Sequence, residues 1–250
     1  MIEIQKLHKS FGDQIVLNDL NLSIPKGKIT VIIGRSGEGK SVFIKHLMGL
    51  IRPDSGKVVI DGINLFDLNQ YKLNEIRKRF GMLFQYAALF DSMTVYENIA
   101  FPIKEHTNKS LKEVTNDVHE LIDLVGLSKI TLPKFPSELS GGMRKRVGLA
   151  RAIALKPEIL LYDEPTTGLD PVMTDVVNHL ILNTQKKLGI TSVVISHDIQ
   201  ATYDIADKIA MLHEGKILLE GDTQTFQNTK NIVVKNFLNG NASPEQLKEI

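Results

Sequence analysis

The chain has 250 residues, of which 42% are hydrophobic and 24% charged, a balance typical of a globular protein that buries a sizeable core. Its formal net charge of +1 gives no reason to expect nucleic acid as a partner, and the lack of cysteine excludes disulfides and thiolate metal sites. No apolar run approaches the roughly 20 residues that cross a bilayer, so work at a membrane would need a partner that spans it.

The first elements predicted along the chain are two strands. Residues 2–7 and 20–24 alternate apolar and polar side chains, which predicts half-buried strands of an antiparallel layer, with a turn over residues 8–13. Phe11 in this turn is either a platform on which a base stacks or a core residue at a strand end.

A strand, a glycine-rich loop and a helix follow. The β-branched run 29–33 precedes the loop, and an apolar helical pattern starts at Val42. The loop reads Gly34, Arg35, Ser36, Gly37, Glu38, Gly39, Lys40, Ser41. Gly-x-x-x-x-Gly-Lys-Ser in this setting predicts a P-loop, in which backbone N–H groups and a helix N-terminus surround phosphates. Lys40 would reach the β- and γ-phosphates of a nucleoside triphosphate, and the Ser41 hydroxyl would bind Mg²⁺.

In the middle of the chain the spacing of apolar residues changes from that of strands to that of helices. Residues 58–60 predict a strand that runs into a tight turn at Asp61-Gly62, and residues 68–154 predict mainly helices. The best-formed helix starts at Ser110, where Glu113 completes a capping box. Its apolar stripe comprises Leu111, Val114, Val118, Leu121, Ile122 and Val125, and Gly126 follows as a C-terminal cap.

The last part returns to alternating strands and helices. The predicted elements are a strand at 159–162, a helix from 170 to 188, a strand at 191–196, a hairpin of 208–212 with 216–220, and a capped helix start at 243–246. Short strands alternating with helices predict a largely parallel sheet flanked by helices.

Two acidic residues follow the strand at 159–162. Asp163 would hold Mg²⁺, directly or through water, and Glu164 would polarise the attacking water as general base. Paired acids after a strand are also common as helix caps, but in a chain with a P-loop the catalytic interpretation is favoured.

Residues 139–143 read Leu-Ser-Gly-Gly-Met and open a further predicted helix. Ser140 with the two glycines forms either an ordinary N-cap or a second anion-binding nest. A second phosphate-binding element in a chain with one P-loop is explained if two copies of the chain associate, so that this element of one copy contacts the nucleotide of the other.

Six stretches together resemble ATP-binding-cassette (ABC) ATPases. In chain order they are residues 34–41, Gln85, 139–143, 160–164, 168–170 and His197, which look like the Walker A, Q-loop, signature, Walker B, D-loop and H-loop. The resemblance covers about residues 1–225. It implies an α/β P-loop NTPase with a RecA-like core, an N-terminal antiparallel β layer and a helical subdomain inserted at about 88–155, followed by a helical tail over 226–250.

The resemblance also implies roles for single residues. Phe11 would stack on adenine, Gln85 would contact Mg²⁺ or the lytic water, and His197 would hold the γ-phosphate. Asp170 would link two sites across a homodimer, and Ser140 with Gly142 would close on the γ-phosphate bound by the other copy. The nucleotide-contacting set is Phe11, residues 34–42 (ending at Val42), Ser140, Gly141, Gly142 and Asp170, with Ser41, Gln85 and Asp163 on the metal.

A finer resemblance concerns the substrate. Residues 40–50, 84–98 and 140–147 look like the ATPase of lipid transporters that work with MCE-domain proteins (the Mla type). This implies a permease partner, an MCE-domain partner, phospholipid or sterol as substrate, and a place on the cytoplasmic face of the inner membrane. Residues 86–90 are then a docking surface for a permease helix, or alternatively a buried connector.

Other functions explain less of the sequence. An ABC ATPase of a different transporter, such as an amino-acid importer, would share the same nucleotide motifs. A soluble ABC ATPase would typically carry two cassettes or a long coiled coil, and the sequence has one P-loop and no heptads. A small-molecule kinase would leave Gln85 and residues 139–143 unexplained.

Overall fold

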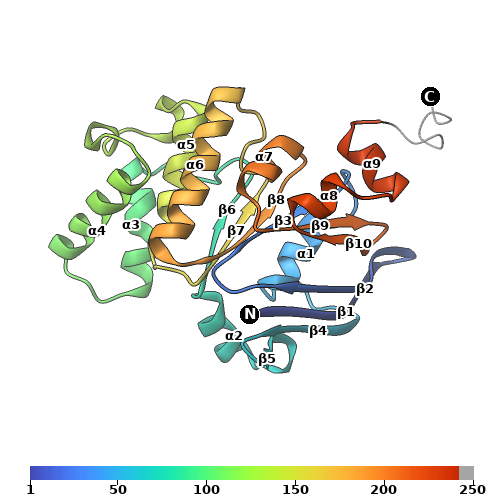
Figure 1. The fold of residues 1–250 in the computed structure, drawn as a ribbon. Coiled ribbons are helices and arrows are strands. Elements are labelled where there is room, and N and C mark those ends of the chain that lie inside the picture. The colour runs from blue at the N-terminus through green and yellow to red at the C-terminus, as the bar shows by residue number, and fades with distance from the viewer. Residues whose placement is uncertain (242–250) are drawn as a thin grey trace. The chain divides into compact units, whose positions relative to one another are not determined.

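The computed structural model describes residues 1–241 (Figure 1). The chain divides into two units, one made of residues 1–73 with the chain from Ile195 onward, the other of residues 74–194. Among the described residues, no helix combines the length and apolar character needed to cross a membrane. The predicted capped start at 243–246 lies outside the described residues.

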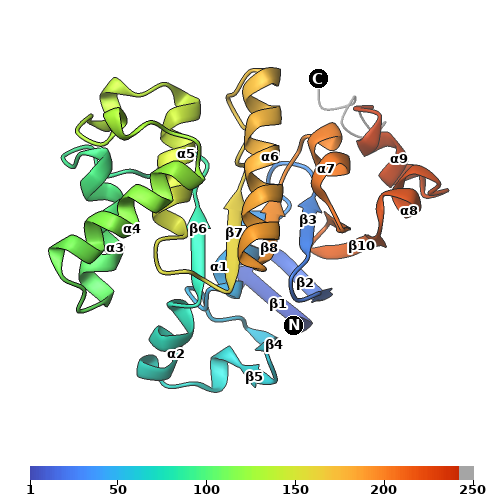
Figure 2. The ribbon, with the colours of Figure 1, turned by 60° about the vertical axis from the view of Figure 1, so that its left-hand side comes forward.

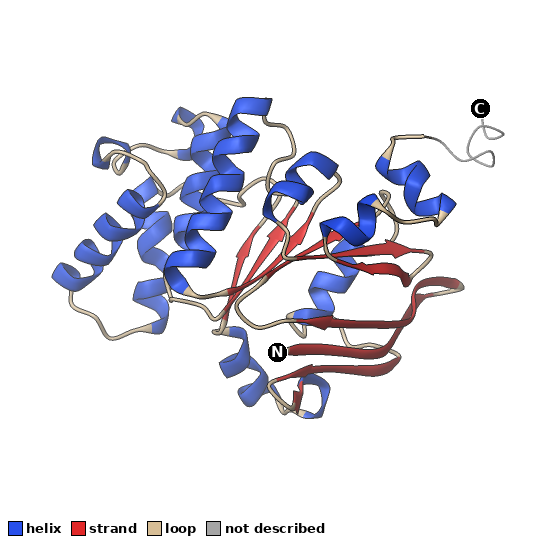
Figure 3. Ribbon diagram, in the orientation of Figure 1, coloured by secondary structure: helices blue, strands red, loops and turns tan. Residues whose placement is uncertain are grey.

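The first unit contains an antiparallel sheet, seen as the red strands near the N-terminus in Figure 3. Its strands, in the order β2-β1-β4-β5, are β1 (Ile2–Phe11), β2 (Gln14–Ile24), β4 (Ser55–Ile60) and β5 (Ile63–Asn64). The predicted antiparallel layer is therefore confirmed. The predicted turn over 8–13 is wrong, because β1 continues to Phe11, which pairs with Gln14, and only two residues separate the strands.

The same unit contains the strand that precedes the glycine-rich loop. All five residues of β3 (Ile29–Ile33) are buried, and β3 pairs in parallel with β9 (Lys208–His213). A strand buried on both faces suits a parallel sheet. The predicted hairpin is confirmed, since β9 pairs antiparallel with β10 (Lys216–Gly221). The helices of this unit are α1 (Lys40–Leu47), α7 (Ile199–Ile205), α8 (Thr223–Gln227) and α9 (Ile232–Leu238).

The second unit contains the strand that carries the acidic pair. Its strands, in the order β8-β7-β6, are β6 (Phe80–Leu83), β7 (Ile159–Asp163) and β8 (Thr191–Ile195). The helical pattern predicted for 68–154 is wrong at β6, which pairs in parallel with β7. A four-residue strand whose partner lies about 80 positions away leaves only a weak local pattern.

Helices α3 (Val95–His106), α4 (Leu111–Leu124) and α5 (Gly141–Ala152) pack together in this unit, and both views show them side by side (Figures 1 and 2). The predicted capping box of Ser110 and Glu113 is confirmed at the start of α4. Leu111 is the exception in the predicted apolar stripe, since 70% of it is exposed. The helical elements of residues 65–194 are η1 (Leu65–Asp67), α2 (Gln70–Arg77), α3 (Val95–His106), α4 (Leu111–Leu124), η2 (Lys129–Thr131), η3 (Pro136–Glu138), α5 (Gly141–Ala152) and α6 (Pro171–Leu188).

Candidate functional site

The glycine-rich loop of residues 34–41 (the phosphate loop) runs from the end of β3 into the first turn of α1, in the first unit. The Lys40 side chain is buried, and its ammonium donates to the carbonyl oxygens of Gly34 and Arg35, each at 2.7 Å. The loop thus curls around its own lysine. Ser36 and Gly37, at the crest, are exposed.

Two glycines in this loop are required by its geometry. Gly34 has φ 155°, and a Cβ there would lie 2.4 Å from the Leu212 carbonyl oxygen. Gly39 has φ 95°, and a Cβ there would lie 2.8 Å from a Val16 methyl group. Both positions combine a backbone conformation that L side chains rarely adopt with a close neighbour. The loop shape therefore depends on residue types that the motif specifies.

Glu38 places an acid inside the phosphate loop. Its Oε1 lies 3.0 Å from Nδ1 of His213, and its Oε2 accepts a hydrogen bond of 2.5 Å from the Glu214 N–H. Both partners belong to the end of β9 and the turn after it. The carboxylate is thus engaged by this turn. His213 was not foreseen as a neighbour of the loop, because 175 positions separate it from Glu38.

Two further predicted residues of the first unit are exposed. Phe11 is 49% exposed, which excludes the core alternative, and the Lys9 ammonium lies 5.4 Å from the centre of its ring. His197 is exposed in the link between β8 and α7. An exposed aromatic face at the end of β1 is available for stacking.

The second unit gathers polar groups around Glu164, which directly follows β7. One carboxylate oxygen of Glu164, Oε2, accepts hydrogen bonds from Nε2 of Gln85 at 3.1 Å and from Oγ1 of Thr167 at 3.0 Å. The backbone of Glu164 has φ 47°, in the left-handed region that non-glycine residues rarely enter. Strained backbone of this kind clusters at functional sites. The structure therefore brings together two predicted catalytic residues, Gln85 and Glu164.

Lys145 is a member of this cluster that the sequence interpretation missed. Only 6% of it is exposed, and its ammonium donates to the Glu164 carbonyl oxygen at 3.3 Å. Burial lowers the pKa of Lys145, and the negative charges of Glu164 and Asp163 oppose that shift. A signal existed, because Lys145 lies three positions after Gly142 and four before Leu149, on the buried stripe of α5.

Ser140 and Asp170 begin the two helices α5 and α6. The Ser140 hydroxyl accepts the Met143 N–H at 3.3 Å, and the Asp170 carboxylate accepts the Met173 N–H at 3.0 Å. Both residues are exposed N-caps. The helix starts approach each other, since a Cβ on Gly142 would lie 2.2 Å from Cε of Met173.

The segment 86–90 presents two aromatics to solvent. Tyr86 is 81% and Phe90 42% exposed, so the alternative of a buried connector is wrong for both rings. The segment is held by the buried side chain of Asn98, which accepts the Phe90 N–H at 2.8 Å and donates to the carbonyls of Phe90 and Met93 at 3.1 Å. Asn98 was not predicted as a site residue.

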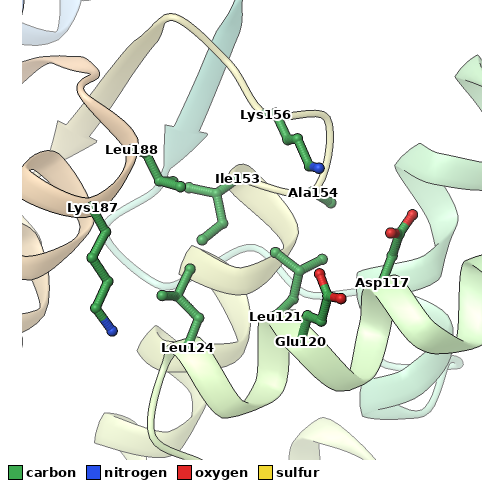
Figure 4. A pocket seen from close by; sticks show the side chains of 9 residues that line it. All are labelled: Asp117, Glu120, Leu121, Leu124, Ile153, Ala154, Lys156, Lys187 and Leu188. Atoms are coloured by element: carbon green, nitrogen blue, oxygen red, sulfur yellow. The ribbon is translucent and has the colours of Figure 1, made fainter.

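The second unit also has an apolar pocket of about 310 Å³ (Figure 4). Leu121 and Leu124 of α4 face Ile153 and Leu188 across it, and charged side chains form its rim. No residue of the predicted nucleotide or metal set lines this pocket.

These features agree with what the comparisons with known proteins found. The family model described as "ABC transporter" matches residues 17–167, more than half of the chain. The chain therefore belongs to the ABC transporter family.

Among curated relatives, "Intermembrane phospholipid transport system ATP-binding protein MlaF" of Haemophilus influenzae is 40% identical over 96% of this chain and 90% of its own length. MlaF of Escherichia coli K12 is 38% identical over 96% and 89%. "Probable ribonucleotide transport ATP-binding protein mkl" of Mycobacterium tuberculosis is 44% identical over 96% of this chain. The chain spans 66% of the length of that mkl protein.

Solved structures confirm the predicted fold class. The dimeric ATP-binding cassette MJ0796, bound to ADP and Pi after hydrolysis, matches with a TM-score of 0.80 at 31% identity, over 89% of this chain and 98% of its own. CbiO1 of Clostridium perfringens, part of the ABC transporter complex cbiONQ, matches with a TM-score of 0.84 at 28% identity, over 100% and 98%. The chain has the ABC ATPase fold.

Proposed function

We propose that this chain is the ATP-hydrolysing subunit of a membrane transporter, working as a homodimer with a permease. The observation that carries the proposal is the cluster around Glu164. A carboxylate whose oxygen accepts two side-chain hydrogen bonds, on a strained backbone after a buried strand, suits a general base that must be held in one orientation.

The phosphate loop fits ATP. The close neighbours of Gly34 and Gly39 leave room only for backbone at these positions, as a loop that approaches phosphates through its N–H groups requires. Lys40 would exchange its two carbonyl acceptors for phosphate oxygens, so its ammonium would stay hydrogen-bonded and would gain a negatively charged partner. Phe11, exposed at the end of β1, would stack on the adenine.

The residues proposed for Mg²⁺ have the right chemistry. Ser41, Gln85 and Asp163 offer only hard oxygen donors, which Mg²⁺ prefers in combination with phosphates and water. The bound ion would neutralise charge that develops on the phosphates.

Hydrolysis would then depend on groups held in place. Glu164 would accept a proton from the attacking water, Gln85 would orient that water, and His197 would contact the γ-phosphate. Ser140 and Gly142 of a second copy would close on the same phosphate, with Asp170 linking the two sites. Ser140 suits this role, because it is exposed at the N-terminus of a twelve-residue helix.

We propose phospholipid or sterol as the substrate class, with an MCE-domain protein as a further partner and a place on the cytoplasmic face of the inner membrane. The MlaF relatives, covered over about nine tenths of their length, support the lipid. The exposed aromatics of 86–90 would receive the permease, and the hydrogen bond from Gln85, which directly precedes this segment, to Glu164 would couple docking to hydrolysis. We further propose that the chain divides into a nucleotide-binding domain over 1–225, with a helical subdomain inserted at about 88–155, and a tail over 226–250.

The test is purification of the native complex from membranes, followed by mass spectrometry of its proteins and bound small molecules. We expect a permease, an MCE-domain protein and co-purified lipid, together with ATP hydrolysis that Glu164→Gln abolishes. A bound ribonucleotide, the substrate class after which mkl is named, or an amino-acid-binding subunit would overturn the lipid proposal and leave the ATPase intact.

A further inference from the structure

Helix α5 carries two positively charged side chains that donate hydrogen bonds to the backbone of two separate segments. Lys145 donates to the carbonyl oxygen of Glu164 at 3.3 Å. Arg151 donates through Nη2 to the carbonyl oxygen of Ala87 at 2.9 Å, and its guanidinium lies 5.5 Å from the centre of the Phe90 ring. The same helix begins at Ser140. One rigid element therefore contacts the signature loop, the general-base segment and the segment after Gln85.

Both acceptor carbonyls belong to residues with strained backbone. Glu164 has φ 47°, Ala87 has φ 61°, and Ala88 next to it has φ 47°. Side chains with a Cβ resist this region, so such conformations persist only where the surrounding structure holds them. A hydrogen bond from a charged donor is stronger than a neutral one and fixes the direction of the carbonyl. The two cations are placed where such support is needed.

Lys145 and Arg151 carry their charges into buried or partly buried surroundings, where hydrogen bonds are needed to offset the cost. Lys145 is almost fully buried and Arg151 partly so, and a buried charge is costly unless it is paired and hydrogen-bonded. Methionine would fill the Lys145 site without that cost, so packing alone does not explain a lysine there.

We propose that Lys145 and Arg151 are positioning residues, through which the helix that starts at Ser140 sets the backbone at Glu164 and beside Gln85. This inference rests on the proposed function, because it assumes that Glu164 and Gln85 act on the lytic water. A small shift of α5 when the Ser140 loop meets nucleotide would move both contacts together, since a helix transmits displacement along its axis. Engagement of one copy's signature loop would thereby adjust that copy's own catalytic groups.

The helix also provides a matched control. Arg146 donates through Nη1 to the carbonyl oxygen of Gly126 at 3.1 Å, and Gly126 also has a left-handed backbone, with φ 68°. Gly126 lies at the C-terminal end of α4 and belongs to none of the nucleotide motifs. Replacing Arg146 removes the same kind of contact from the same helix without touching the proposed catalytic backbone.

The kinetic test compares ATP hydrolysis and nucleotide affinity of the full chain in its transporter complex. Lys145→Gln should lower kcat about tenfold while the Kd for ATP changes by less than about twofold, because the base is misplaced and the phosphate loop is intact. Lys145→Arg should recover part of kcat. Arg146→Gln should lower thermal stability and leave kcat near that of the wild type. Equal kcat in Lys145→Gln and Arg146→Gln would overturn the proposal.

Hydrogen exchange of the purified full chain tests positioning without catalysis. Lys145→Gln should raise amide exchange in peptides covering 163–168, and Arg151→Gln should raise it in peptides covering 84–90. Arg146→Gln should raise it in neither. Unchanged exchange in both segments would overturn the positioning proposal. A wild-type complex that binds ATP without hydrolysing it would overturn the proposed function alone, because the exchange pattern is still decided by the variants.

Discussion

The phosphate loop and the Glu164 cluster are held in opposite ways. Within the loop, Lys40 bonds to carbonyls five and six positions earlier in the chain. Around Glu164, the partners Gln85, Lys145 and Thr167 lie 79, 19 and 3 positions away. The lysine of the phosphate loop is therefore held within one short segment, although Glu38 of the same loop is also held by His213 and Glu214, whereas the proposed general base is held mainly by distant parts of its unit. Damage to the first should reduce binding, and damage to the second should reduce turnover.

The largest effect is expected at Glu164. Glu164→Gln keeps an oxygen near the amide of Gln85 but removes the proton acceptor, so ATP hydrolysis should fall by at least about a hundredfold. ATP binding should remain, and a nucleotide-bound dimer should accumulate, as measured by phosphate release and size-exclusion chromatography. An ATP-loaded variant that stays monomeric even with its permease would contradict the account.

Lys40→Ala should act on binding instead. It removes a buried ammonium whose charge-assisted hydrogen bonds are each worth about 1.5–3 kcal/mol, so the Kd for ATP should rise roughly ten- to a hundredfold. Calorimetric titration measures the change. Lys45→Ala is the matched control, because Lys45 is an exposed lysine on the same helix. Equal affinity in both variants would refute the assignment of the loop.

Glu38 should give a smaller effect of the same kind. Glu38→Ala removes the contacts to His213 and Glu214 that engage the loop, so the KM for ATP should rise about two- to fivefold with kcat unchanged. Glu38→Gln retains an acceptor for the Glu214 N–H and removes a negative charge near the phosphates. The KM of Glu38→Gln should therefore lie at or below that of the wild type. A KM for Glu38→Gln above that of Glu38→Ala would show that the contacts of Glu38 to His213 and Glu214 do not support the loop.

The smallest effect concerns the helix behind the phosphate loop. His46 of α1 is fully buried, with Nδ1 2.7 Å from the Val42 carbonyl oxygen, and burial lowers its pKa below 6.5. The unfolded chain then binds a proton that the folded chain does not, so the free energy of unfolding should decrease as pH falls through 6.5. Urea midpoints between pH 7.5 and 5.5 should shift less in His46→Gln, and an equal shift would assign the effect to other groups.

Local patterns sufficed for much of the fold. The phosphate loop, the capping box at Ser110 and the start of α6 at Asp170-Pro171 each depend on a few adjacent residues, and the structure places helices where these patterns predict them. The strand β6 was missed, because its two-residue period spans only four residues and its stability comes from pairing with β7.

The candidate site divides in the same way. The motif identified the residues of the phosphate loop, but nothing near Glu38 indicated His213. Lys145 was detectable as a lysine on a buried helical stripe, but its partner Glu164 follows from the packing of α5 alone. Asn98 and Arg151 hold the segment after Gln85 through contacts to carbonyl groups, which side-chain types do not encode.

The phosphate loop is proposed to be half of a site, with the Ser140 loop supplied by a second copy of the chain. Two variants test this, Lys40→Ala in the phosphate loop and Ser140→Asp, which keeps an N-cap residue but places a carboxylate against phosphate. At an ATP concentration near the wild-type Kd, each alone should have little ATPase activity, because every site in its dimer is damaged.

A mixture of the two variants contains dimers in which one site combines an intact phosphate loop with an intact Ser140 loop. With half of the dimers mixed and one of their two sites intact, ATPase activity should return to about a quarter of the wild-type value. A mixture no more active than the two variants measured separately would contradict the shared site.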